Sequence, residues 1–143
     1  MSVNFSCADV ELVLSEPQLL KKWIADIIVS HGKKLGKINY LFCSDEHIYE
    51  TNVKFLNHDT YTDIITFDYV EGLLVSGDIL ISVDRVRDNA QSFSVPFEQE
   101  LRRVIIHGVL HLLGFKDKTE LDATEMRHKE NESLDRYDML KKE

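Results

Sequence analysis

The alternation of hydrophobic and polar positions predicts a strand followed by a helix at the start of the chain. Residues 3 to 7 (VNFSC) alternate in the way of a strand with one buried face. Ser15, Pro17 and Gln18 then provide an N-cap, an early proline and a capping-box partner, which predict a helix that continues to Gly32. The apolar stripe of this helix consists of Leu20, Trp23, Ile24, Ile27 and Ile28. Such a stripe indicates core packing.

The middle of the chain reads as two more strand regions separated by a short helix. Residues 37 to 43 (KINYLFC) predict a strand, and Ser44 is a suitable N-cap for a helix over 45 to 56. Residues 63 to 70 (DIITFDYV) are rich in β-branched and aromatic types, and the run LLVSGDILIS follows directly after Glu71 and Gly72. We expect these two runs to pair as a hairpin.

The last part of the chain has helical periodicity throughout. Helices are predicted at about 83 to 92, 96 to 113 and 120 to 141. We therefore expect an α/β (α+β) fold in which a small mixed sheet of about four strands is covered by about five helices. At 143 residues, the chain is expected to form a single domain, 1 to 143.

Composition and charge argue against several classes of protein. With 43% hydrophobic and 29% charged residues, neither a disordered nor a fibrous protein is indicated. No apolar run approaches the ~20 residues of a membrane span, so we expect a cytoplasmic protein without a membrane partner. The net charge of −8 disfavours a generally basic surface, but residues 1 to 42 hold five lysines against four acids. The lysines between 21 and 37 are therefore the first candidates for contact with a polyanion.

The predicted helix over 96 to 113 contains a candidate metal site. His107 and His111 lie one turn apart, so both imidazoles project from the same face. Gly114 is suited to end the helix in a left-handed conformation and to turn the chain back, which would bring Asp117 near both histidines. A histidine pair at this spacing is by itself more often an ordinary surface or core feature. The glycine turn and the carboxylate make the metal interpretation stronger.

Three protein ligands with a fourth position open are typical of catalytic zinc, whereas structural zinc usually has four ligands. The pattern H-x-x-x-H-x-x-G-x-x-D therefore predicts one zinc ion per chain, held by His107, His111 and Asp117. Glu100 and Arg103 lie on the same helical stripe. A metallopeptidase of the H-E-x-x-H type would have a glutamate directly after the first histidine, where this chain has Gly108. That class is disfavoured.

The string HGVLHLLGFKD, residues 107 to 117, resembles the signature H-G-x-L-H-L-x-G-Y-D-H of the YbeY family of zinc-dependent endoribonucleases and ribosome-maturation factors. Asn52, Phe55, Asp59 and the run TDIITF (62 to 67) are similar to that family's N-x-x-[FY]-R-x-x-D-x-x-T-D-V-L-S-F, and GDILIS (77 to 82) is similar to its next strand. Three matches in the same order are more specific than one.

Two positions depart from this pattern. Asp117 stands where the family usually has a third histidine, and it lowers the formal charge of a zinc site from +2 to +1. Leu56 stands where the family usually has an arginine associated with activity. Lys54 and Arg103 are candidates to replace it by charge alone.

The resemblance implies a zinc-dependent endoribonuclease that acts on single-stranded RNA, including the precursor 3′ end of small-subunit ribosomal RNA, in rRNA processing and ribosome biogenesis. It also implies the ribosomal small subunit, or its proteins, as partner. The catalytic water is expected to be bound to zinc, and no protein general base is assigned: Asp63 is only a guess, since an aspartate beside Thr62 equally suits a loop cap. Two alternatives stay open: a non-catalytic ribosome assembly factor with a structural zinc, and a metallopeptidase.

Overall fold

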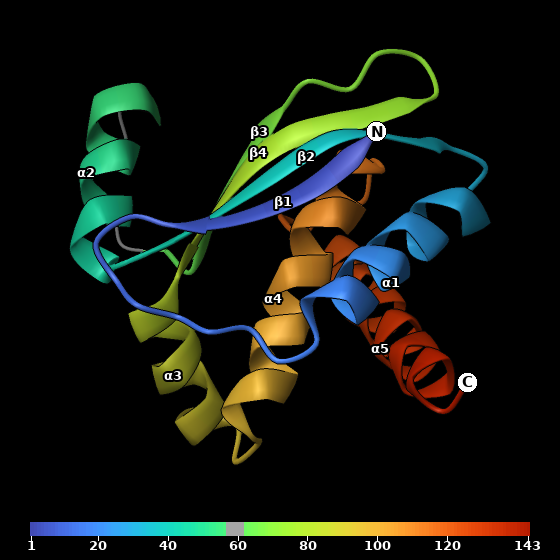
Figure 1. The fold of residues 1–143 in the computed structure, drawn as a ribbon. Helices are drawn as coiled ribbons and strands as arrows, with labels where there is room; N and C mark the ends of the chain where they lie inside the picture. Colours follow the sequence, from blue (N-terminus) through green and yellow to red (C-terminus); the bar gives the residue numbers. More distant parts are fainter. Residues whose placement is uncertain (57–61) are drawn as a thin grey trace.

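The computed structural model describes residues 1 to 56 and 62 to 143, and its centre is a twisted four-stranded sheet (Figure 1). The strands are β1 (Ser2–Cys7), β2 (Lys34–Cys43), β3 (Ile64–Asp68) and β4 (Leu74–Ser82). They lie in the order β1-β2-β4-β3, with β1, β2 and β4 parallel to one another and β3 antiparallel to β4. The predicted mixed sheet and the predicted hairpin are confirmed.

Five helices in the described part of the chain cover this sheet. They are α1 (Pro17–Ser30), α2 (Asp45–Leu56), α3 (Val83–Ser92), α4 (Phe97–Leu112) and α5 (Glu120–Lys141). Figure 1 shows α1, α4 and α5 together on one side of the sheet. Helix α2 lies beside the left-hand end of the sheet in this view. None of the described helices has both the length and the apolar character needed to span a bilayer.

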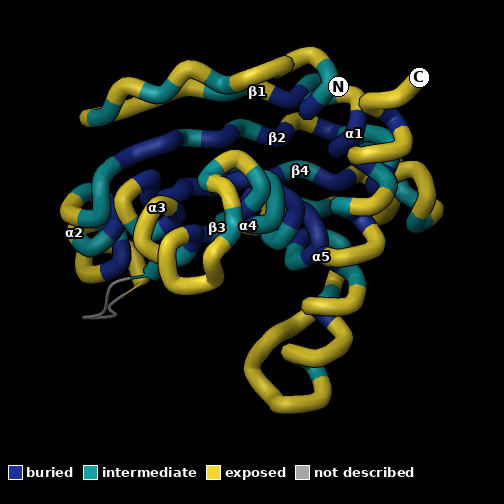
Figure 2. The backbone as a smooth tube through the Cα atoms, turned by 90° about the horizontal axis from the view of Figure 1, so that it is seen from below, coloured by how far each residue is buried: buried dark blue, intermediate teal, exposed yellow. Residues whose placement is uncertain are grey.

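Helix α4 lies at the centre of the hydrophobic core, between the sheet and α5. Figure 2 shows buried residues along β2 and α4, while exposed residues follow the outer turns of α5. Tyr40 of β2 is fully buried, and its hydroxyl donates to the carbonyl of Ile105 at 2.9 Å. Trp23 of α1 is also fully buried, and its indole donates to the carbonyl of Ser133 in α5 at 2.7 Å. These bonds satisfy buried polar groups and fix α4 and α5 in place.

The predicted ends of the elements agree with the structure to within a few residues, but one cap was wrong. Helix α1 begins after Glu16, which has a left-handed conformation (φ 54°) and makes no side-chain cap. Ser15 therefore lies outside the helix. The Glu16 carboxylate instead lies 3.6 Å from the Lys141 ammonium of α5, so it forms an ion pair between two helices and does not cap its own helix. Ser44 does cap α2, because its hydroxyl accepts from the backbone N–H of His47 at 3.1 Å.

Candidate metal centre

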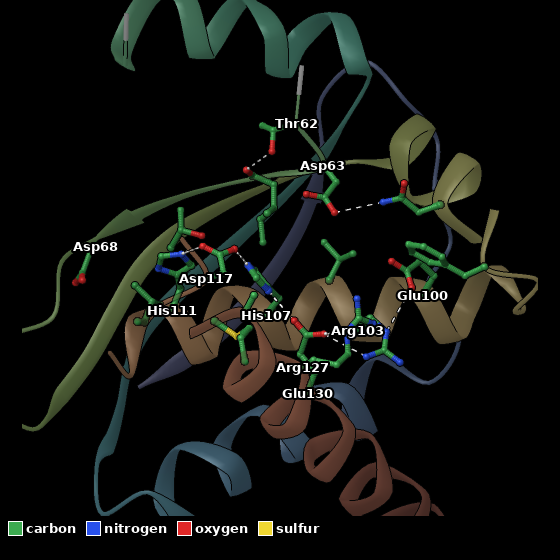
Figure 3. Close-up of a pocket in the computed structure, with 18 residues that line it drawn as sticks. Thr62, Asp63, Asp68, Glu100, Arg103, His107, His111, Asp117, Arg127 and Glu130 are labelled. Carbon is green, nitrogen blue, oxygen red and sulfur yellow. Dashed lines mark hydrogen bonds and ion pairs between the residues drawn. The ribbon is translucent and has the colours of Figure 1, made fainter. Parts of the chain in front are cut away.

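A pocket of about 530 Å³ lies between the segment that leads into β3, one face of α4 and the first half of α5 (Figure 3). Its polar lining residues are Thr62, Asp63, Thr66, Asp68, Asn89, Glu100, Arg103, His107, His111, Asp117, Arg127 and Glu130. The helical stripe predicted from the sequence, which places Glu100 and Arg103 on the face of the histidines, is therefore present. The pocket combines titratable groups from four separate parts of the chain, which is typical of a functional site.

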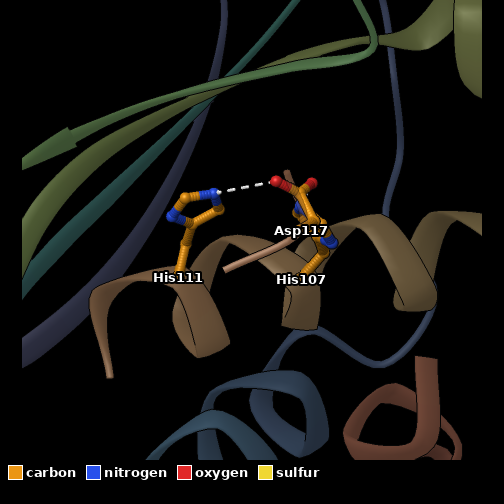
Figure 4. Close-up of side chains that lie close together, drawn as sticks. All are labelled: His107, His111 and Asp117. Atoms are coloured by element: carbon orange, nitrogen blue, oxygen red, sulfur yellow. Dashed lines mark ion pairs between the residues drawn. The ribbon is translucent and has the colours of Figure 1, made fainter. Parts of the chain in front are cut away.

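His107, His111 and Asp117 meet at one end of this pocket (Figure 4). Nε2 of His107 lies 3.4 Å from Oδ2 of Asp117, and Nε2 of His111 lies 3.7 Å from Oδ1 of the same carboxylate. One ligand atom from each residue can be chosen so that all three lie within 4.8 Å of one another. The fold therefore brings together the three residues that were expected from the sequence to lie close to one another.

The end of α4 brings Asp117 to the histidines. The last helical residue is Leu112, and the N–H of Gly114 donates back to the carbonyl of His111 at 3.0 Å. Gly114 has φ +104°, a backbone conformation that residues other than glycine rarely adopt. This turn reverses the chain, so that Asp117 returns over the face of α4 that carries the histidines. The predicted left-handed turn is confirmed.

These three side chains fit a metal ion such as zinc. Two imidazole nitrogens and a carboxylate oxygen are donors of the type that zinc accepts, at about 2.0 to 2.2 Å. Two atoms at that distance from a tetrahedral ion are about 3.3 Å apart, close to the 3.4 and 3.7 Å between the imidazoles and the carboxylate. The pocket leaves room for a further ligand. The residues could therefore hold a metal while one position stays open.

Behind the histidines lies a residue that the sequence analysis did not identify. Glu130 of α5 is only 5% exposed, and its Oε2 lies 2.7 Å from Nδ1 of His107. Burial, the largest single effect on His107, opposes its protonation, but Glu130, Asp117 and Asp63 together raise the pKa of the imidazole. One signal for Glu130 was present in the sequence, because it occupies the buried stripe of α5. That stripe consists of Met126, Glu130, Ser133, Tyr137 and Leu140.

Two further carboxyl groups face the pocket. Burial raises the pKa of Asp63, and the nearby charge of His107 opposes this effect. The Asn89 amide donates to Asp63 at 3.4 Å. Burial also raises the pKa of Glu100, which is 3% exposed, while Arg103 and Arg127 act in the opposite direction. Oε1 of Glu100 lies 3.5 Å from Nε of Arg103, an ion pair without hydrogen-bond geometry.

The glycine after the first histidine has a packing role. A Cβ atom on Gly108 would lie 2.9 Å from Cδ1 of Ile79 and 3.1 Å from Cδ1 of Ile64. Real Cβ atoms essentially never approach other atoms more closely than 3.0 Å. Helix α4 thus contacts the sheet closely at this point, and a glutamate could not be placed here unless the isoleucine side chains or the helix moved. The sequence argument against a peptidase of the H-E-x-x-H type is strengthened.

Other residues considered from the sequence lie elsewhere. The lysines of residues 21 to 37, Lys54 and Leu56 are not among the described residues that line the pocket. Lys54 instead lies over the Phe55 ring, and Leu56 is 39% exposed at the end of α2. A further histidine, His128, lies outside the pocket and pairs with Glu132 on the surface of α5. Asp59, one of the matched motif positions, lies outside the described residues.

Comparison with known proteins agrees with this geometry. The model of the family described as Endoribonuclease YbeY matches residues 7 to 138. A Flavobacterium johnsoniae protein named Endoribonuclease YbeY is 51% identical over 132 residues, which cover 92% of this chain and 94% of that protein. One from Porphyromonas gingivalis is 50% identical over 132 residues, covering 92% and 87%.

The fold comparison points the same way. The solution structure of a Thermotoga maritima protein superposes with a TM-score of 0.65 at 26% identity, covering 94% of this chain and 88% of that one. The match to the family model spans both histidines, the Gly114 turn and Asp117. This chain therefore belongs to the YbeY family of endoribonucleases.

Proposed function

We propose that this protein is a zinc-dependent endoribonuclease that cleaves single-stranded RNA, and that its physiological substrate is the precursor 3′ end of small-subunit ribosomal RNA during ribosome biogenesis. The observation that carries the metal part of the proposal is the convergence of His107, His111 and Asp117, whose ligand atoms lie within 4.8 Å of one another on the pocket wall. Family membership supports RNA as the substrate.

Each side chain of the pocket has a role in this proposal. His107, His111 and Asp117 hold the zinc. When bound, zinc supplies Lewis acidity toward a phosphoryl oxygen and lowers the pKa of a bound water. Asp63 faces the same space, and burial keeps its pKa above the usual range, so it is suited to accept a proton during hydrolysis. Asn89 orients the Asp63 carboxylate through the 3.4 Å hydrogen bond.

The RNA backbone needs positive charge in a pocket that contains many carboxylates. Arg103 and Arg127 both line this pocket. The Arg103 side chain is 15% exposed and contacts Glu100, Glu130 and Asn131. Arg127 is 53% exposed, and its ion pair with Glu130 is long, at 3.8 Å. We therefore assign contact with a substrate phosphate to Arg127, and a mainly structural role to Arg103.

The test is cleavage of RNA by the purified protein. A labelled single-stranded RNA, a precursor of small-subunit rRNA and casein are each incubated with the protein, with chelator, and with chelator followed by excess Zn²⁺. We expect cleavage of both RNAs, loss of cleavage with chelator and its return with Zn²⁺, with casein intact. His111→Ala should abolish cleavage, whereas His128→Ala, the same change on the exposed surface, should not.

The outcomes separate the alternatives that the sequence left open. Bound zinc without RNA cleavage would favour the ribosome assembly factor, in which the metal has only a structural role. Chelator-sensitive casein cleavage would favour a peptidase. Cleavage of the labelled RNA but not of the ribosomal precursor would support the nuclease and contradict the proposed substrate.

A further inference from the structure

We infer that Glu130 is the positioning residue that selects which nitrogen of His107 is available to the metal. The inference rests on the proposed function, because it concerns the same three-ligand site. Glu130 comes from α5, whereas His107 comes from α4, so their contact joins two helices across the wall of the pocket.

Glu130 is placed where a carboxylate is costly to bury. It is 5% exposed and occupies a position in the buried stripe of α5. Burying a charged group is unfavourable unless donors surround it. Arg103 and His107 are the donors here, at 3.2 Å and 2.7 Å, and Arg127 adds a longer ion pair at 3.8 Å.

The two oxygens of Glu130 have different partners. Oε1 lies near both arginines, at 3.2 Å from Arg103 and 3.8 Å from Arg127. Oε2 contacts Nδ1 of His107. Arg103 is itself held on its other sides by Glu100 and Asn131. Arg103 therefore fixes the carboxylate from one side and leaves Oε2 to the imidazole.

This arrangement determines the tautomer of His107. A neutral imidazole carries one proton, and only the nitrogen without it can bind a metal. Oε2 of Glu130 accepts a hydrogen bond, so the proton resides on Nδ1 and the lone pair on Nε2. Nε2 is the atom that lies 3.4 Å from Asp117, in the metal cluster. The carboxylate thus prepares His107 for the ion before the ion arrives.

His111 provides a comparison within the same site. Its side chain is 40% exposed, and its ion-pair contact with Asp117 also involves Nε2. Within residues 1 to 56 and 62 to 143, no hydrogen-bond acceptor is found at Nδ1 of His111. Its tautomer is therefore left to solvent, and a change at Glu130 should alter His107 while His111 stays as it is.

The experiment measures the tautomer and the metal affinity separately. In metal-free protein labelled with ¹⁵N, long-range ¹H–¹⁵N spectra at a pH where both imidazoles are neutral show which ring nitrogen carries the proton. Affinity for Zn²⁺ is measured by competition with a chromophoric chelator. Glu130→Leu fills the space without an acceptor, and Glu130→Gln keeps one acceptor oxygen. Glu132→Gln is the matched control, since Glu132 lies on the exposed side of the same helix.

We expect the Nδ1–H tautomer at His107 in the wild type and its loss in Glu130→Leu, with Zn²⁺ affinity reduced about 10- to 100-fold. Glu130→Gln should lose less, because its single oxygen can still accept from Nδ1. Glu132→Gln should match the wild type in both measurements.

An Nε2–H tautomer at His107 in the metal-free wild type would overturn the inference without any variant, so it stays testable even if Glu130→Leu fails to fold. Wild-type Zn²⁺ affinity in both Glu130 variants would overturn it as well. Absence of Zn²⁺ binding by the wild type would instead contradict the proposed function, and the tautomer measurement would still decide the role of Glu130.

Discussion

Replacing Gly108 by alanine tests how closely α4 contacts the sheet. The added Cβ would lie 2.9 Å from Cδ1 and 3.1 Å from Cγ2 of Ile79, a side chain with no exposed surface. Because Ile79 is enclosed by the core, it has little room to turn away. Either the isoleucine leaves its preferred rotamer or α4 shifts away from β4.

Two opposing effects decide the change in the free energy of unfolding. Overpacking a well-packed core costs about 1 to 3 kcal/mol. Alanine is favoured over glycine within a helix by about 1 kcal/mol. The net expectation is that Gly108→Ala is between about 0 and 2 kcal/mol less stable than the wild type, although the same exchange at an open helical site would be stabilising.

The assay is urea denaturation in the presence of chelator, so that metal binding does not contribute to the measured stability. The pair Glu125→Ala and Glu125→Gly on the exposed face of α5 measures the preference for alanine over glycine in this protein. We expect alanine to be the more stable at 125 and to have no advantage at 108. If alanine stabilises position 108 as much as position 125, the close contact between α4 and the sheet is wrong.

Three further variants test the site. Asp117→Ala should reduce zinc retention while the free energy of unfolding in chelator stays within about 0.5 kcal/mol of the wild type, since the carboxylate lies on an exposed turn; zinc content equal to the wild type would mean that another group is the third ligand. Arg127→Met should raise KM for RNA and lower the slope of log affinity against log salt by about 1, with zinc content unchanged, and an unchanged slope would remove Arg127 from the RNA contact. Asp63→Asn tests how the free energy of unfolding of the metal-free protein depends on pH. Burial raises the pKa of Asp63 in the folded state, so ionisation of this group lowers stability as the pH rises above about 3.9, the pKa of aspartate in the unfolded chain. The variant should therefore be more stable than the wild type at pH 7 and lose this advantage at pH 3, whereas an equal advantage at both values would contradict burial of the charge.

The triad of His107, His111 and Asp117 could be predicted as a cluster because its geometry is local. His107 and His111 share a helix, and Gly114 defines the turn that returns Asp117, so all three lie within eleven residues. The hairpin of β3 and β4 was predictable for the same reason, since the two strands are neighbours in sequence. The parallel pairings of β2 with β1 and β4 join distant segments and were not predicted.

The residues that support the triad could not be found in this way. Glu130 approaches His107 only because α5 packs along α4, and one carboxylate among many on a charged helix does not stand out. The lysines proposed for RNA contact do not line the pocket, and the direction of their side chains could not be predicted. Lys21 lies over the Phe5 ring and Lys22 lies 4.0 Å from Glu143. Their charge was visible in the sequence, but their direction depends on the face that α1 buries.

The bond between Trp23 and α5 gives this protein an intrinsic optical reporter. Trp23 is the single tryptophan of the chain, and its indole N–H binds the carbonyl of Ser133, three residues beyond Glu130 on the same helix. The ring also meets Tyr137 edge to face, with centroids 5.2 Å apart. Detachment of α5 would bring water to the indole and move its fluorescence to longer wavelength. The emission of Trp23 can therefore report, in real time and without a label, whether the buried face of α5 that carries both Ser133 and Glu130 is still packed against its neighbours.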